Sequence, residues 1–408
     1  MGIQKTSIVF TGDIGFDKYM TSKWEDDNLL SDSVLEYFYS ADHVCANVEG
    51  ALFEVPDDGT RGVCFHAMNP KATKVLRKMQ ADIWNIGNNH IMDAGIEGLI
   101  STKKIAEMEN CRTVGAGLNR TDASEPIYLK EAGGIGILSV TYMAGCVPAT
   151  DTDPGIFRWD EMDYIEKRIA EIKTRCKWCV VVSHGGEEFS ALPFPYTRDR
   201  YLKYLEMGAD VVVGHHPHVP ESYELFDNRK AIFYSLGNYI FDTDYQRAHL
   251  YTDTGILLKL IFTEQNIDFD AIAIHIDRTT ERIDMTEMPA IFTNIPVDEY
   301  ELLAPLSAKA FIAEDMRVMR YLEPQNFKNC ADKVWDDYYD HIVSSYYSEN
   351  AHMDYDKILP LAQEAENGKW QESKLEEVKA YILRQLKLPY PIDYKYTHNR
   401  LESIKNER

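Results

Sequence analysis

Histidine, asparagine and carboxylate residues gather directly after apolar segments of this 408-residue chain. The run "ADIWNIG" is followed by Asn88–His90, and the run "ADVVVG" is followed by His215–His218. Neutral imidazole is the commonest metal ligand in proteins, and ligands collect just past the carboxyl ends of strands in open α/β sheets. The two patches therefore predict an enzyme with a metal site.

Other polar residues follow further apolar runs, and most of them lie beside glycine, which lets the backbone turn sharply at the end of a strand. In chain order, this strand-end set comprises Asp13, Asn47, Glu49, Asn89, His90, Asp93, His184, Glu187, His216, His218, Ser235 and Asn238. One such residue alone would more commonly cap a helix or make a structural contact. Because the carboxyl ends of parallel strands meet at one edge of a sheet, the whole series predicts a single shared site.

The order of these motifs resembles the calcineurin-like metallophosphoesterase superfamily and, within it, the CapA family associated with poly-γ-glutamate capsule synthesis. The motifs are GDIG, NVEG, GNNHIMDAG, SHGGEE, GHHPHV and YSLGNYIFD, and they cover roughly the first 250 residues. The resemblance implies an α/β fold, namely a four-layer α/β/β/α sandwich with two facing sheets and a site at their shared edge.

The resemblance also implies roles for individual residues. The metal ligands would be Asp13, Glu49, Asn89, His184, His216 and His218. His90 would protonate a leaving oxygen, and Asp93 could orient that imidazole through its other ring nitrogen. Glu187, three residues after His184, is a candidate for a general base or for a residue that supports a ligand.

These ligands divide between two cation positions. The first position would be formed by Glu49, Asn89, His184 and His216, an oxygen and nitrogen set suited to Mn, Fe or Zn. The second position would have Asp13, Glu49 and His218, because the usual further histidine ligand falls on Gly15. We therefore expect one or two divalent cations, with the second held loosely, bound with extra water or absent. Asp17 is an alternative ligand, although an Asp at the start of a surface helix is more commonly structural.

Substrate contacts are predicted from loops near the same motifs. Arg61 is the first candidate, because a guanidinium group can bind a phosphate or carboxylate through two hydrogen bonds. His66 and Arg247 lie on other loops that could reach the site, and Asn47 and Asn238 complete the predicted substrate-binding set. The expected substrate is small and anionic or peptide-like.

The charge balance excludes some partners. The chain has 43 Lys and Arg residues against 66 Asp and Glu residues, a formal net charge of -23. The electrostatic field of this net negative charge repels nucleic acid and anionic membrane surfaces. An anionic substrate would therefore need local cations to bind it. The sequence shows neither a signal peptide nor a run of ~20 apolar residues, and its seven scattered cysteines do not form a disulfide framework. We expect a soluble, cytoplasmic protein.

The predicted elements suggest two regions. Up to about residue 250, β-branched runs alternate with helical patterns, which by itself predicts one doubly wound sheet with helices on both faces. Two adjacent runs, at 255–262 and 267–276, predict an antiparallel hairpin that closes the sheet. We assign residues 1–295 to the CapA-like domain and 296–408 to a helical extension, with helices at 308–321, 329–347 and 375–386. These helices could form a homo-oligomer interface.

Three functions agree with these patterns. The first is a metal-dependent hydrolase of the metallophosphoesterase type that acts on a phosphoester or on a γ-glutamyl or capsule-related substrate. The second is a metal-independent enzyme that epimerises a peptide Cα, with Asp13, His90 or His184 exchanging protons. The third is a non-catalytic assembly protein for polymer synthesis. Metal content and solvent deuterium incorporation would distinguish them.

Overall fold

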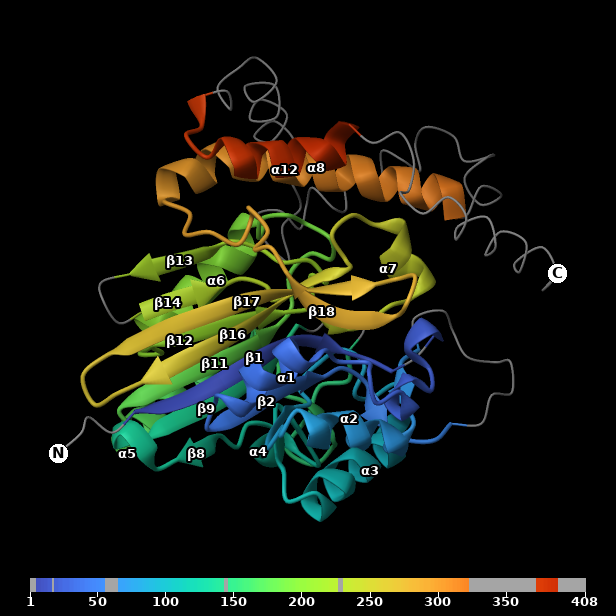
Figure 1. Cartoon of the computed structure of the whole chain (residues 1–408). Coiled ribbons are helices and arrows are strands. Elements are labelled where there is room, and N and C mark those ends of the chain that lie inside the picture. Colours follow the sequence, from blue (N-terminus) through green and yellow to red (C-terminus); the bar gives the residue numbers. More distant parts are fainter. Residues whose placement is uncertain are drawn as a thin grey trace.

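The computed structural model of the chain describes residues 5–16, 18–55, 65–142, 146–226, 230–322 and 372–387. These residues form two mixed β-sheets that pack face to face, with helices on both outer surfaces (Figure 1). This arrangement confirms the four-layer α/β/β/α sandwich. The single doubly wound sheet predicted from strand and helix alternation alone is wrong, because alternation does not determine which sheet a strand joins.

The first sheet combines parallel and antiparallel strands in the order β18-β17-β16-β1-β2-β5-β6, and β15 pairs with the end of β1. The parallel strands β1, β2, β5 and β6 bring their carboxyl ends to one edge. The predicted hairpin is confirmed as β16 and β17. The bounds are β1 Thr6–Ile14, β2 His43–Val48, β5 Ile83–Asn85, β6 Arg112–Val114, β15 Asn238–Ile240, β16 Thr254–Phe262, β17 Ile267–Asp277 and β18 Arg282–Thr286.

The second sheet has the order β13-β14-β12-β11-β9-β8, and its strands β9, β11, β12 and β14 are parallel. The bounds are β8 Ile127–Leu129, β9 Ile135–Thr141, β11 Trp178–His184, β12 Val211–His215, β13 Tyr223–Phe226 and β14 Lys230–Phe233. Two short pairs lie outside the sheets: β3 Ala51–Leu52 with β4 Ala67–Met68, and β7 Ala116–Gly117 with β10 Gly155–Ile156.

Alternation of side chains along the strands explains why the sheets stack. Ile8 and Phe10 of β1 belong to the core between the sheets, where they join Val180 and Val182 of β11. The intervening residues point outward, so Val9 packs in the core under the helices of the first sheet. Because successive side chains of a strand face opposite sides, a continuous apolar run buries both faces of its sheet.

Helices cover the two outer faces. The first sheet is covered by α1 Asp32–Tyr39, α2 Thr73–Lys78 and α3 Gly95–Met108, and the second by α5 Met162–Arg175 and α6 Pro195–Glu206. The remaining short helices of this region are α4 Arg120–Ala123 and α7 Asp244–Ala248, with 3-10 turns at Lys18–Met20, Lys23–Glu25, Pro70–Ala72 and Glu131–Gly133.

The C-terminal region contributes two described helices, α8 Val297–Leu322 and α12 Glu376–Lys387, which lie side by side along one end of the sandwich (Figure 1). The predicted helix 308–321 covers only the second half of α8, which begins at Val297, and the predicted helix 375–386 agrees with α12 to within one residue. The third predicted helix, at 329–347, lies outside the described residues. Leu303 of α8 and Ile382 of α12 share an apolar cluster with Leu192 and Ile291 of the sandwich. The division at residue 296 and the oligomer interface stay predictions.

Two chain-wide expectations concern membranes and thiols. Among the described helices, none combines the length and the apolarity that crossing a bilayer requires. Cys176 and Cys179 are not joined in a disulfide. Burial raises the pKa of the Cys179 thiol, which argues against a reactive thiolate in this pair.

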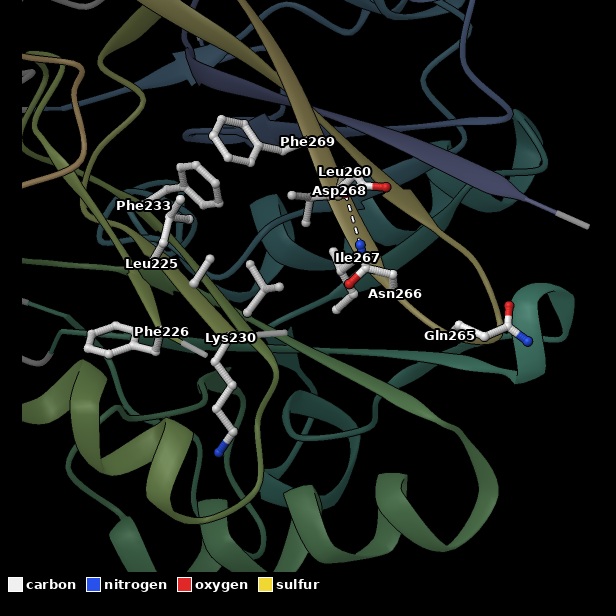
Figure 2. Close-up of a pocket in the computed structure, with 12 residues that line it drawn as sticks. Leu225, Phe226, Lys230, Phe233, Leu260, Gln265, Asn266, Ile267, Asp268 and Phe269 are labelled. Carbon is white, nitrogen blue, oxygen red and sulfur yellow. Dashed lines mark hydrogen bonds between the residues drawn. The ribbon is translucent and has the colours of Figure 1, made fainter. Parts of the chain in front are cut away.

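A cavity of about 900 Å³ opens between the sheets at one edge of the sandwich (Figure 2). Phe233 and Phe269 line it together with the turn that joins β16 and β17. Val211 and Lys230, which also line it, begin β12 and β14. The predicted metal ligands follow the other ends of such strands, so this cavity lies at the edge away from them.

Candidate metal centre

One buried carboxylate lies where the two sheets meet. Glu49 follows β2, is fully buried, and its Oε1 atom faces the Nε2 atoms of three imidazoles. The distances are 3.6 Å to His184, 3.8 Å to His218 and 4.0 Å to His90. These separations exceed hydrogen-bond length. They fit donors that share a cation, since two atoms each ~2.1 Å from one ion lie ~3 to 4.2 Å apart.

The first cation position contains the donors that the motifs predict. Donor atoms of Glu49, His184 and His216 all lie within 4.8 Å of one another. Asn89 Oδ1 lies 2.8 Å from His184 Nε2, which adds the amide oxygen. Burial lowers the pKa of His184 well below its usual value and that of His216 to about 3. Both rings are therefore neutral, the form that binds metals.

The second cation position contains donor atoms of Asp13, Glu49 and His218 within 4.8 Å of one another. The His218 Nδ1–H group donates to Asn238 Oδ1 at 2.8 Å, which leaves Nε2 directed toward Glu49. Burial alone would lower the pKa of His218, but the charges of Glu49 and Asp13 outweigh it and raise the pKa to about 10. The carboxylates thus favour a positive charge here.

Three neighbouring histidines point in different directions after β12. His215 Nε2–H donates to the Thr11 carbonyl at 2.8 Å, so this ring links the two sheets. His216 and His218 have φ values of 95° and 58°. These left-handed conformations are costly for residues with a Cβ and are concentrated at functional sites. They turn both rings to the site.

The predicted proton-transfer pair is present. His90 Nδ1 lies 2.8 Å from Asp93 Oδ2, and the same carboxylate oxygen accepts the backbone N–H of His66. The His66 ring packs edge-on against His90, with ring centroids 4.3 Å apart. Burial is the main cause that lowers the pKa of His90. Asp93 therefore holds a neutral ring whose Nε2 faces the site.

The two asparagines predicted to bind substrate lie behind the ligands. Asn47 Nδ2 donates to Asp13 Oδ1 at 2.6 Å, and Asn47 Oδ1 accepts from Asn85. Asn238 holds His218, as described above, and donates to the Thr252 carbonyl. Asn47 is 1% exposed and Asn238 is fully buried. These contacts support a role in orienting ligands.

The predicted arginine contacts have different outcomes. Arg61 and the alternative ligand Asp17 lie outside the described residues. Arg247 is buried and forms an ion pair with Asp242 through its Nε and Nη2 atoms. Its guanidinium group also covers the ring of Tyr19 at 3.7 Å. Arg247 therefore serves the packing of this loop.

The structure brings Glu188, and not Glu187, among the imidazoles. Glu187 Oε2 accepts the Phe194 N–H at 3.4 Å, and its charge helps to raise the pKa of Tyr196 after burial. Glu188 Oε1 lies 4.0 Å from His216 Nε2. No motif spacing distinguishes Glu188 from its neighbour, and the catalytic role of Glu187 stays a prediction.

Comparisons with known proteins agree with the motifs. PGA biosynthesis protein CapA of Bacillus subtilis (strain 168) is 33% identical over 250 residues, which are 59% of this chain and 65% of that protein. Capsule biosynthesis protein CapA of Bacillus anthracis is 28% identical over 259 residues, 60% of this chain and 62% of that protein. The chain thus spans less than two thirds of the length of these curated relatives.

Among solved structures, a 5'-nucleotidase from Candida albicans SC5314 aligns with a TM-score of 0.37 and 11% identity, over 65% of this chain and 50% of that one. The fold assignment therefore rests on the layers and strand order described above. The family model described as Bacterial capsule synthesis protein PGA_cap matches residues 7–243, which is more than half of the chain. This chain belongs to the bacterial capsule synthesis protein PGA_cap family.

Proposed function

We propose that this protein is a hydrolase of the metallophosphoesterase type that depends on a divalent cation. The observation that carries the proposal is that the Nε2 atoms of two predicted ligands, His184 and His218, lie 3.6 and 3.8 Å from Glu49 Oε1. His215 differs, because its ring donates to a backbone carbonyl at 2.8 Å and belongs to none of the groups of potential metal donors among the described residues. Imidazoles directed at one carboxylate oxygen from just beyond hydrogen-bond length favour a shared cation.

The donor set fits Mn, Fe or Zn, because it combines neutral imidazoles with carboxylate and amide oxygens. A divalent cation bound there would polarise the scissile bond and offset negative charge that develops on the substrate. Asn47 donates a hydrogen bond to Asp13, and Asn238 accepts one from His218, so these predicted ligands would be oriented before a cation binds. Such support behind the ligands is a regular feature of metal sites.

The chain's own proton carrier is His90. Asp93 engages Nδ1–H, so the neutral ring presents Nε2 as a proton acceptor toward Glu49. After it accepts a proton, the ring can donate that proton to the leaving oxygen. Glu187 remains a candidate general base from the sequence, although its contacts lie with Phe194 and Tyr196.

The substrate we propose is small and anionic or peptide-like, in poly-γ-glutamate or capsule-related metabolism. The net charge of -23 opposes the approach of an anion. Bound cations would offset that field locally, so carboxylate or phosphate groups could bind at the site. The capsule context rests on the family and on the names of the two Bacillus proteins.

The test compares the wild type with His216→Ala on a chromogenic phosphodiester and on a γ-glutamyl oligomer, with and without chelator. We expect cation-dependent hydrolysis of at least one substrate and a loss of about 100-fold or more in the variant. His275→Ala on β17, away from the motifs, serves as the control. Hydrolysis that survives both chelator and His216→Ala would refute the proposal. Solvent deuterium entering a peptide Cα under chelator would support an epimerase instead.

A further inference from the structure

The second cation position has no room for a histidine side chain at residue 15, where the resemblance to metallophosphoesterases would place a further ligand and this chain has Gly15. A Cβ atom built on Gly15 would lie 2.7 Å from Cε2 of Phe241, which is closer than such atoms approach. The Phe241 ring also lies against His218, with ring centroids 4.8 Å apart. An aromatic ring therefore fills this side of the position, and a replacement donor has to come from another direction.

Another donor does approach from the loop that follows β11. One oxygen of Glu188 and one ring nitrogen each of His216 and His218 lie within 4.8 Å of one another. His218 also belongs to the group formed with Asp13 and Glu49. The Glu188 group thus shares His216 with the first position and His218 with the second. The first position already has four donors, Glu49, Asn89, His184 and His216, whereas the second has three, so a carboxylate between them would complete the second.

The residue that follows Glu188 is held in place by several contacts. The Phe189 N–H donates to the Pro217 carbonyl at 2.8 Å, which joins this loop to the turn that carries His216 and His218. Phe189 has a φ of 66°, an uncommon conformation that the surroundings must hold. Its ring stacks on His249 at 3.8 Å, and its carbonyl accepts from Gln385 Nε2 of α12.

We infer that Glu188 is a carboxylate ligand of the second cation position, with Asp13, Glu49 and His218. This inference rests on the proposed function, since it assumes that the protein binds divalent cations. The Glu188 side chain is 36% exposed, whereas that of Glu49 is fully buried. A cation that depends on Glu188 therefore sits nearer to solvent and exchanges more readily than one held at the first position.

The experiment is Mn²⁺ titration by calorimetry, with metal content measured after dialysis, on the full chain. We expect the wild type to bind one tight and one weaker equivalent. Glu188→Gln should weaken the second equivalent at least about tenfold and leave the first unchanged, since even supporting residues of metal sites are worth 10–100-fold. Glu206→Gln, which changes an exposed carboxylate at the end of α6, is the control and should bind as the wild type does.

The outcomes separate this inference from the proposed function. If the wild type binds two equivalents and Glu188→Gln binds both with unchanged affinity, or loses the tight one, the assignment of Glu188 is wrong. A single equivalent in both proteins also overturns it. If the wild type binds no cation, the proposed function fails as well. Circular dichroism and a second variant, Glu188→Ala, show whether a loss of binding comes from misfolding.

Discussion

The two cation positions share Glu49 but are built differently. The first takes its other donors from residues at or just past the ends of β5, β11 and β12, all within the part that matches the family. The second relies on Asp13 and His218 and, by our inference, on Glu188. The loop that carries Glu188 contacts α12, a helix that lies outside the family match at residues 7–243. Asp13 lies within β1, so the proposed second position differs from the first mainly in Glu188 and its loop. We therefore expect the occupancy of the second position to vary more than that of the first.

Replacing a ligand of the first position should have the largest effect. His184→Ala removes a fully buried imidazole, and we expect it to abolish tight cation binding and lower hydrolysis about 100-fold or more. His218→Ala should keep the tight cation and lose the weaker one. Metal content after dialysis into metal-free buffer, followed by steady-state assays, measures both. Equal metal loss in the two variants would mean that the positions are not distinct.

Graded removal of cations should reveal the same order in the unmodified protein. The donors of the first position, Glu49, His184 and His216, are buried, while the Glu188 side chain is partly exposed. A weak chelator should therefore remove one equivalent before a stronger one removes the other. Metal content and activity are measured across the series. Loss of both equivalents in a single step would contradict the comparison.

Removing the Phe241 ring is a way to add a histidine ligand to the second cation position. Gly15→His alone should destabilise the protein by about 1–3 kcal/mol, because overpacking forces neighbours to move. Adding Phe241→Ala makes space for the imidazole. The double variant should be more stable than the sum of the single changes by about 1 kcal/mol or more.

The same double variant should bind the second cation more tightly than the wild type does. Chemical denaturation gives the stabilities, and Mn²⁺ titration gives the affinity. Additive stabilities together with unchanged affinity would show that Phe241 does not occupy the place of a missing ligand.

Strand periodicity predicts where the strands end, and the predicted ligands that are most deeply buried lie at or just past those ends. His184 lies at the end of β11, and His216 follows the end of β12 directly, so locating the strands locates the side chains. The sequence could not tell which of His215, His216 and His218 face the site. Left-handed backbone at His216 and His218 decides this, and no spacing rule predicts it.

Side-chain positions are harder to predict from the sequence in the loops that follow the strands. Glu187 and Glu188 are adjacent residues of the same type. The turn at Gly185 and Gly186 ends the strand, so the alternation of side chains between the two faces of the sheet no longer tells which glutamate faces the site. The structure places Glu188 near His216 and His218, while the role of Glu187 stays a prediction. Substrate contacts by Asn47 and Asn238 also stay predictions, and the sequence alone does not reveal that both amides are buried.

The smallest effect is expected from the C-terminal helices. Gln385 of α12 is fully buried, and its Nε2 donates to the Phe189 carbonyl at 2.9 Å and to Glu314 of α8 at 2.7 Å. Gln385→Ala removes both bonds, which should cost about 1–3 kcal/mol because the buried acceptors lose their donor. Glu377→Ala, at an exposed position of the same helix, is the control.

Because Phe189 follows Glu188, this variant should also weaken the second cation by a few-fold while the first stays bound. Thermal denaturation and Mn²⁺ titration measure the two effects. A loss of stability without any change at the second position would limit α12 to a packing role. A selective change at that position would instead show that helices outside residues 7–243 tune the site that the family motifs build.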